Sequence, residues 1–421
     1  MNNKKIKLSM SVILTITCLY GTNGDNLISV GTKSRGMGGA GIGVSHCAES
    51  TLQNPALITC TRDTTISMGG LLFMPKISAQ MGMAQEHESD TGTSIIPSLA
   101  ISKKLNDNWY FGIGIWGTAG MGIDYSQKKQ IPNRDSGNMH METSLQLMQF
   151  GASLAYHQDG FGVAVTPIAQ YGRLDIKYQS FDGSPVGDDV SSDLAFGLNL
   201  GAYYDFKNGL TLGTVYKSKI DMKYGNQLST ATQPFANFGI FPQAMAEHLE
   251  QPGEVGIGIG YKFGTHTLAF DYKKVQWAEA KGYKEFGWKD QDVYAVGYQF
   301  KLEQLRFRLG YNYASHPISA FPSGPAVIHA GDYAQAGGNA LNLFNLLGFP
   351  ATAEQHYTVG GGYEFSNNLD LDWSYVYAPK TSTKMNTIVG MNSQTGDLYT
   401  GESIVNHTES SLSLQLSYRF F

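Results

Sequence analysis

The stretch Gly31–Ile58, GTKSRGMGGAGIGVSHCAESTLQNPALI, separates two regions of different character. It is rich in glycine, and it ends close after the turn-forming sequence Asn54-Pro55-Ala56. Beyond it, over Thr64–Phe421, apolar and polar residues alternate in runs that are broken by turns. Such alternation is typical of β-strands. A small flexible segment followed by many strands predicts a plug inside a β-barrel.

The clearest strand spans Asp193–Phe206, where every second residue is apolar, so that these side chains share one face. The set is Leu194, Phe196, Leu198, Leu200, Ala202, Tyr204 and Phe206, and the pattern recurs in Val255–Phe263, Leu305–Tyr313 and Leu412–Phe420. Nothing after Tyr20 offers the roughly 18 consecutive apolar residues of a membrane helix, so only a closed barrel would cross a bilayer. Aromatic residues at the strand ends favour a lipid-facing barrel over a soluble sandwich.

Six tight turns each join two alternating runs, as hairpins require. They lie at residues 106–108, 158–160, 207–209, 264–265, 303–304 and 366–368. With the flanking runs Thr64–Met74 and Ser411–Phe421 they predict an all-β, antiparallel transmembrane barrel of about 14 strands, with both ends on the periplasmic side. The long connections then face outward, at residues 76–93, 119–143, 179–191, 225–253, 278–290, 315–355 and 380–409.

The apolar residues of one run change parity midway. Those of its first half are Phe161, Val163 and Val165, and those of its second half are Leu174, Ile176 and Tyr178. A β-bulge near Pro167 would reconcile the two halves. Charged residues on the polar parity of their strands are expected to face the lumen, mostly as paired wall charges; they are Arg173, Asp175, Lys217, Lys219, Arg306 and Arg308.

The N-terminus has the layout of an export signal, because Lys4, Lys5 and Lys7 precede the apolar stretch Leu8–Tyr20 and small residues follow. We therefore divide the chain into a signal peptide over residues 1–24, a plug over 25–60 and a barrel over 61–421. A net charge of -5 with only 15% charged residues provides no basic surface for nucleic acid.

Two motifs resemble one known family. The sequence GTxSRGMGGAG at residues 31–41, followed by Asn-Pro-Ala-Leu-Ile, resembles the N-terminal hatch of the FadL-like transporters of long-chain fatty acids and aromatic hydrocarbons. The tract Asn345–Phe365, NLLGFPATAEQHYTVGGGYEF, resembles the FPA…HYTLG sequence of the same family. The resemblance implies a bacterial outer-membrane channel for passive uptake, with neither an enzymatic reaction nor a cofactor. It also implies a kinked third strand, here Trp109–Ala119, that opens the wall sideways, although the sequence does not place the opening.

The resemblance assigns the hatch and its gating to Arg35, Gly36, Gly38, Gly39, Gly41, Asn54, Pro55 and Ala56, with Asn54-Pro55-Ala56 as the anchor on the barrel interior. The glycines also match the dinucleotide pattern GxGxxG, but no strand precedes them and no βαβ unit follows. We expect them instead to let the backbone pack closely inside the lumen. The ten histidines show no metal-binding spacing and no GxSxG motif is present, so neither a metal site nor a lipid hydrolase is predicted.

The cysteines indicate one possible crosslink. Cys18 leaves with the signal, whereas Cys47 and Cys60 remain in a compartment that oxidises thiols. A disulfide between them would connect the end of the hatch to the first strand. The sequence does not show whether the two sulfur atoms meet.

Two outer connections are unusually apolar, and exposed apolar patches commonly mark binding surfaces. The candidate ligand-binding residues there are Phe235, Phe238, Phe241, Leu343, Phe344, Leu347 and Phe349. The alternative is that these side chains cap the barrel as a small core. Arg306 and Arg308 are further candidates, because a guanidinium can receive a ligand carboxylate.

The sequence thus predicts an outer-membrane barrel that passes hydrophobic small molecules through a plugged lumen, with lateral release. The expected partners are that ligand, outer-membrane lipid and lipopolysaccharide, and the barrel-assembly machinery. An unspecific porin is one alternative, and it would need a polar constriction and no plug. A structural or adhesin barrel that acts through its outer loops is the other.

Overall fold

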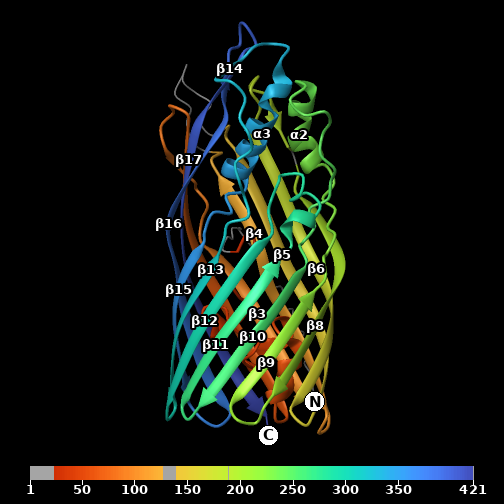
Figure 1. The fold of residues 1–421 in the computed structure, drawn as a ribbon, viewed down its shortest axis with the longest axis vertical. Helices are drawn as coiled ribbons and strands as arrows, with labels where there is room; N and C mark the ends of the chain where they lie inside the picture. Colours follow the sequence, from red (N-terminus) through yellow and green to blue (C-terminus); the bar gives the residue numbers. More distant parts are fainter. Residues whose placement is uncertain (1–22, 127–138, 188, 421) are drawn as a thin grey trace, which may run out of the picture.

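The computed structural model describes residues 23–126, 139–187 and 189–420, so most of the predicted signal lies outside the described residues. The described chain forms one closed antiparallel sheet, in which β1 pairs with both β3 and β17 (Figure 1). Of its seventeen described strands, β2, β7 and β14 have two residues each, which leaves fourteen long strands. The predicted fourteen-stranded antiparallel barrel is confirmed.

The long strands are β1 (Thr64–Met81), β3 (Ser94–Lys104), β4 (Trp109–Asp124), β5 (Glu142–Gln158), β6 (Phe161–Gln179), β8 (Ser191–Asp205), β9 (Leu210–Lys217), β10 (Glu254–Phe263), β11 (His266–Val275), β12 (Gln291–Leu302), β13 (Leu305–Ala314), β15 (Gln355–Glu364), β16 (Leu369–Met391) and β17 (Leu398–Phe420). The short ones are β2 (His87–Glu88), β7 (Pro185–Val186) and β14 (Val327–Ile328). The helical elements are α1 (Thr32–Arg35), η1 (Cys47–Leu52), η2 (Pro55–Cys60), α2 (Leu228–Asn237), η3 (Trp277–Glu279), η4 (Tyr333–Ala336), α3 (Gly337–Leu343) and η5 (Phe344–Gly348). No helix among the described residues combines the length and the apolar character that a membrane span needs.

The barrel has a turn end and a loop end (Figure 1). All six predicted tight turns are confirmed, and they join β3 to β4, β5 to β6, β8 to β9, β10 to β11, β12 to β13 and β15 to β16. At the turn end β1 begins with Thr64 opposite Phe420 of β17, so the barrel starts and finishes on one side. The connections that hold α2, α3 and β14 lie at the loop end (Figure 1).

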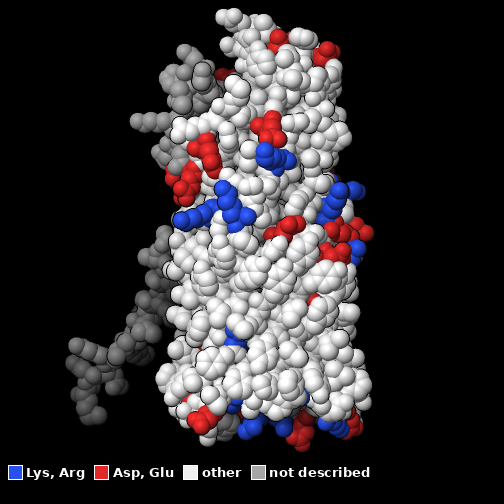
Figure 2. All heavy atoms as spheres, turned by 60° about the vertical axis from the view of Figure 1, so that its left-hand side comes forward, with Lys and Arg blue, Asp and Glu red and all other residues white. Residues whose placement is uncertain are grey.

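The outer surface carries the apolar faces that the alternation predicted. Phe196 of β8 is 71% exposed, and the C-terminal run of β17 also points outward. The outward apolar residues of these two strands include Leu194, Leu200, Tyr204, Leu412, Leu414, Leu416, Tyr418 and Phe420. On the face shown in Figure 2, a band with few charged side chains separates the charges of the turn end from those of the upper half. Such a band is the expected contact surface for the lipid hydrocarbon.

The predicted bulge near Pro167 is wrong. β6 keeps one register with β5 on both sides of this residue, with Gly151 opposite Ile168 and Leu154 opposite Val165. Side chains in odd positions point outward throughout β6, so Phe161 is 45% exposed whereas Leu174 is buried. The apolar residues change face because the upper part of the strand lies beyond the lipid, where the lumen is apolar. For the same reason Arg173 and Asp175 face outward and not into the lumen, contrary to prediction.

The strands at the loop end are longer than predicted. The sequence indicated a loop over residues 380–409, but β16 continues to Met391 and β17 begins at Leu398. The pairing survives two register shifts, one between Ala378 and Thr381 and one between Ile388 and Gly390. Here the buried face mixes apolar residues, such as Met385 and Val405, with polar ones, such as Thr387 and Ser403, so the backbone pairing continues without a regular apolar alternation to reveal it.

Candidate functional site: the filled lumen and its wall

The N-terminal segment, defined here as residues 23–63, lies inside the barrel at the level of the lipid-facing band. Its α1, η1 and η2 contact strands from all sides, including β3, β5, β8 and β16. Among its predicted gating residues, Arg35 is buried and donates from its guanidinium to the Ser29 carbonyl and to the Ser411 hydroxyl of β17, at 3.0 and 2.6 Å. The lumen is therefore filled at this level and is not an open aqueous pore.

The predicted glycines lie at close contacts of the N-terminal segment: Gly36 and Gly38 touch the barrel wall, whereas Gly39 and Gly41 pack against Ile28 and Gln53 of the segment itself. Gly38 and Gly39 have φ of +69° and +88°, and a Cβ on Gly38 would lie within 2.7 Å of the Tyr311 backbone. Gly36 packs against Gly360 of β15, where an added Cβ would come within 3.3 Å of the wall Cα. Glycine is required here for its backbone conformation and for its missing side chain.

The Asn54-Pro55-Ala56 sequence fastens the segment to the wall. Asn54 is buried, and its side-chain amide donates to the Ile42 carbonyl at 2.8 Å and to the Ala202 carbonyl of β8 at 3.2 Å. Its side-chain oxygen accepts from the Ala56 N–H at 3.2 Å and so caps η2, in which Pro55 is the first residue. One side chain thereby connects two parts of the segment and one wall strand.

Wall carboxylates hold the segment at two further places, which the sequence did not single out. Asp271 of β11 accepts from the backbone N–H groups of Gly41 and Ile42, at 2.7 and 2.8 Å. On the other side Lys33 lies 3.3 Å from Glu49 and 3.7 Å from Asp372 of β16. In the sequence, both Asp271 and Asp372 occupy strand positions that alternate inward, but many other polar residues of the wall do the same, so this pattern alone does not identify them.

Arg306 and Arg308 are already paired with carboxylates of the chain. The Arg308 guanidinium is buried, lies 2.8 Å from Asp372, and donates to the Gln299 side chain and the Gly361 carbonyl at 2.8 and 3.0 Å. Arg306 contacts Glu364 and lies 3.6 Å from Asp370. This arrangement supports the alternative of paired wall charges over a site for a ligand carboxylate.

The two lysines that were predicted to face the lumen differ from each other. Lys217 is paired with Glu254 at 3.0 Å. Lys219 is partly exposed, lies 3.3 Å from Glu279, and does not line the lumen wall as predicted.

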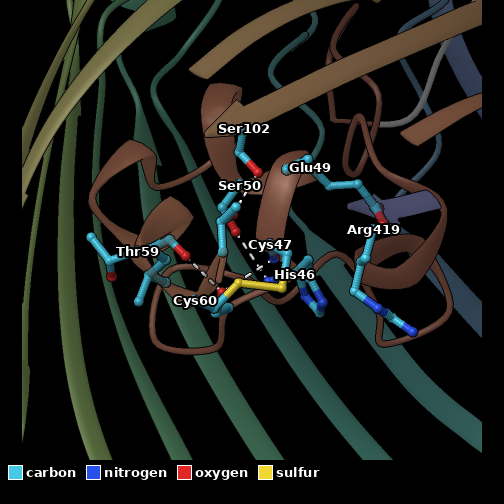
Figure 3. The surroundings of a disulfide bond; sticks show 12 residues. His46, Cys47, Glu49, Ser50, Thr59, Cys60, Ser102 and Arg419 are labelled. Atoms are coloured by element: carbon cyan, nitrogen blue, oxygen red, sulfur yellow. Dashed lines mark hydrogen bonds between the residues drawn. A yellow bond between two sulfur atoms is a disulfide. The ribbon is translucent and has the colours of Figure 1, made fainter. Parts of the chain in front are cut away.

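A disulfide joins Cys47 in η1 to Cys60 at the end of η2, with Cα atoms 5.6 Å apart (Figure 3). Around it the Ser45 hydroxyl donates to the Leu57 carbonyl at 2.7 Å, and the His46 N–H donates to the Ser50 hydroxyl at 3.0 Å. The crosslink therefore holds the two short helices of the N-terminal segment together.

We expect peptide mapping of the non-reduced protein to recover Cys47 and Cys60 in one linked peptide, because the periplasm oxidises paired thiols. Closing a loop of this length stabilises a fold by about 3 kcal/mol. A Cys47→Ser/Cys60→Ser variant should therefore show lower thermal stability. Alkylation of both thiols in freshly isolated membranes, without prior reduction, would contradict this expectation.

The seven apolar loop residues meet at the loop end, inside the mouth of the barrel. Phe235 of α2 is at the centre, with its ring centroid 5.1 Å from Phe344 of η5 and 5.5 Å from Phe241. Leu343, Phe344, Leu347 and Phe349 are buried in the same cluster, and Phe238 packs against it. We call this cluster the apolar core. Aromatic residues that the sequence did not single out complete it; they are Tyr178, Trp277, Tyr283, Phe286 and Trp288.

A cavity of about 80 Å³ lies between the N-terminal segment and the wall strands. Its lining is mixed, with Lys217 and Glu254 on one side and Asn26 and Leu27 on the other. Thr118 of β4 also reaches it, so the cavity borders the barrel wall at that strand. The cavity is small, and passage of a ligand requires the surrounding side chains to move.

The wall is interrupted beside this cavity. β4 pairs with β3 only as far as Trp116, which lies opposite Ser98. Directly after this point, the pairing of β4 with β5 on its other side has a register shift between Gly117 and Ala119. Above this point the edge of β4 bonds to the N-terminal segment instead. The Leu27 N–H donates to the Thr118 carbonyl at 3.0 Å, and Asn26 forms a bridge with Ala119. We call this place the β3–β4 gap, and residues 25–27 its seal.

Asp25 connects the seal to the outer loops. Its carbonyl accepts from the Gly120 N–H of β4 at 2.8 Å, and its carboxyl accepts from the side chains of Tyr283 and, at 2.9 Å, Gln251. The carboxyl is completely buried, and this burial raises the pKa of Asp25 to about 6 against the opposing effect of its hydrogen bonds. Since Tyr283 belongs to the apolar core, Asp25 connects the core directly to the seal.

The family described as outer membrane protein transport protein (OMPP1/FadL/TodX) matches residues 23–327, which is more than half of the chain. The chain belongs to this family. The barrel and the family together place this OMPP1/FadL/TodX member in the bacterial outer membrane.

Individual relatives of this family are distant. The 47 kDa outer membrane protein of Pasteurella multocida is 22% identical over 83% of this chain and 86% of its own length. Outer membrane protein P1 of Haemophilus influenzae is 22% identical over 89% of this chain and 90% of its own. Solved structures with the same fold include a Pseudomonas aeruginosa FadL homologue, with a TM-score of 0.66, 16% identity, and coverage of 94% of this chain and 100% of the other. The toluene transporter TodX of P. putida has a TM-score of 0.64 and 15% identity, with coverage of 96% of this chain and 99% of the other.

Proposed function

We propose that this OMPP1/FadL/TodX member is a passive channel for hydrophobic small molecules, which leave the lumen sideways through the β3–β4 gap. The observation that carries the proposal is the seal, because residues 25–27 occupy the edge of β4 that β3 leaves unpaired. Release of the seal would connect the central cavity to the lipid without opening the barrel to water. No chemical step is required.

The proposed route has three parts. A ligand leaves water at the apolar core, where each buried methylene contributes about 0.8 kcal/mol. It then displaces side chains toward the central cavity, and Asp25 passes this movement to the seal. Because binding strength grows with apolar area, uptake should favour longer or larger hydrophobic molecules.

In this proposal residues 25–60 act as the hatch. Arg35, the glycines from Gly36 to Gly41 and the Asn54-Pro55-Ala56 anchor keep it in the lumen, and the apolar core takes the ligand. Residues 1–24 would be removed on export, and residues 61–421 would be inserted by the barrel-assembly machinery among lipid and lipopolysaccharide. Long-chain fatty acids and aromatic hydrocarbons are the two candidate substrate classes. The matched P. putida protein is a toluene transporter, which favours including an aromatic probe.

The test is uptake of radiolabelled toluene and oleate by cells that carry the protein, compared with cells that lack it. We expect faster uptake of at least one probe and unchanged influx of small sugars. Equal uptake of both hydrophobic probes, together with faster sugar influx, would assign the chain to the porins. Equal uptake of all probes would leave the outer loops as the functional surface, as in an adhesin.

A further inference from the structure

Three titratable side chains of the lumen wall meet directly below the apolar core. The His407 Nε2 lies 3.0 Å from one carboxylate oxygen of Glu409, and the His356 Nε2 lies 3.5 Å from the other. His407 and Glu409 belong to β17 and His356 to β15, and none of the three side chains is more than 3% exposed. We call them the proton cluster. No group of three metal-binding side chains in the described ranges is placed to hold a metal ion.

A count of protons distinguishes this cluster from an ordinary ion pair. The Nδ1 of His407 lies 3.1 Å from the Pro350 carbonyl, which only accepts, so this nitrogen carries a proton when the bond is made. The Nε2 of a neutral His407 would then turn a lone pair toward the ionised Glu409. The contact is favourable only when the pair holds one more proton, on the imidazole or on the carboxyl group.

This extra proton is exchangeable because His407 has a second option. The Thr352 hydroxyl lies 3.3 Å from Nδ1, and it can donate to this nitrogen. His407 then carries its single proton on Nε2 and donates to an ionised Glu409. Pro350 and Thr352 lie in the segment that leads from the apolar core to β15, so the position of that segment selects between the two states.

The charge of the cluster acts on the N-terminal segment through Arg35. Burial lowers the pKa of Arg35 to about 10, and the negative charge of Glu409 acts in the opposite direction. The other charged groups around the segment have partners of their own or are exposed. They are Lys33 with Glu49 and Asp372, Arg308 with Asp372, Asp271 with the Gly41 and Ile42 N–H groups, Asp25 with Tyr283 and Gln251, Glu354 with the His316 N–H, and the outward-facing Lys76 and Lys380. The geometry agrees, because the Arg35 guanidinium donates to the Ser411 hydroxyl at 2.6 Å, and Ser411 lies two positions after Glu409 on the same buried face of β17.

We propose that His356, His407 and Glu409 bind one exchangeable proton, and that this proton determines how firmly Arg35 holds the N-terminal segment in the lumen. The inference rests on the proposed function, since it regulates the same gate. Without the extra proton the cluster is negative and attracts Arg35. With it the cluster is neutral, Arg35 loses its counter-charge, and the segment is released more easily. Acid conditions therefore loosen the segment.

The test is hydrogen–deuterium exchange of the purified full-length protein in detergent, without substrate, at about pH 5.5 and about pH 8. Protection of residues 32–39, corrected for the intrinsic pH dependence of exchange, should fall about tenfold at the acid pH, the equivalent of one pKa unit. His407→Gln and Glu409→Gln should remove this pH dependence. His266→Gln, at the turn end beside Tyr298, should retain it.

Protection that does not change with pH in the wild-type protein would overturn the proposal. So would an unchanged pH dependence in His407→Gln. If Glu409→Gln does not assemble, as judged from the mobility of unboiled protein on gels, the wild-type profile and His407→Gln decide between these outcomes. The exchange experiment contains no substrate, so its result does not depend on transport. If protection of the segment changes with pH but the protein carries neither toluene nor oleate, only the proposed function is overturned.

Discussion

Cells that carry an Asn26→Cys/Ala119→Cys variant will take up toluene and oleate no faster than cells without the protein, and a reductant will restore uptake. Asn26 and Ala119 form the antiparallel bridge between the seal and β4. Directly opposed residues of such a pair have Cα atoms about 4.5 to 5.5 Å apart, which a disulfide spans. The new crosslink would hold the seal on the β3–β4 gap while leaving the outer loops free to bind ligand.

Two controls make this experiment specific. The native cysteines are replaced in a Cys47→Ser/Cys60→Ser background, so that the reductant acts only on the new bond. A matched crosslink, Thr214→Cys/Ile257→Cys, joins opposed residues of β9 and β10 on the outer face and should leave uptake unchanged. Undiminished uptake by the oxidised Asn26→Cys/Ala119→Cys protein would place the exit elsewhere, such as beneath the N-terminal segment.

The wall of this barrel was predictable because lipid contact favours apolar side chains on its outward face. Most outward side chains in the lipid-facing band are apolar, so runs such as Leu194–Phe206 reveal both the strand and its orientation. This preference fails above the lipid. There Leu174 and Ile176 face an apolar lumen and Arg173 faces water, so the same alternation has the opposite meaning.

The interior was less predictable because its contacts join distant parts of the chain. Asp271 accepts a hydrogen bond from Gly41, a residue 230 positions away, and the sequence around neither residue indicates this contact. The β3–β4 gap is still harder to foresee, since it consists of hydrogen bonds that β3 does not make. The apolar loop residues lie in one cluster, as the alternative of a small core that caps the barrel expected, but their sequence does not show which other residues complete it. The ligand role of these residues remains a prediction.

An Asn54→Ala variant should open the barrel to ions and small polar solutes. Asn54 is completely buried, and the change removes the cap of η2 and both donors to the Ile42 and Ala202 carbonyls. A lost cap costs about 1 kcal/mol, and each buried group left without its partner about 1 to 3 kcal/mol. A loss of this size is large against the marginal stability of a small segment packed in a lumen.

The measurement is conductance in planar lipid bilayers, where the wild-type protein should be nearly silent and Asn54→Ala should show open events. Asn208→Ala changes an exposed asparagine that accepts from Leu210 in a turn, and it should behave as wild type. Lys217→Gln alters a cavity charge without touching the anchor, so its effect should be smaller. Asn54→Asp keeps the oxygen that caps Ala56 but buries a carboxyl group against the Ile42 and Ala202 carbonyls, so it should open the barrel at least as much as Asn54→Ala. A conductance of Asn54→Ala no greater than that of Lys217→Gln would show that the anchor does not hold the hatch.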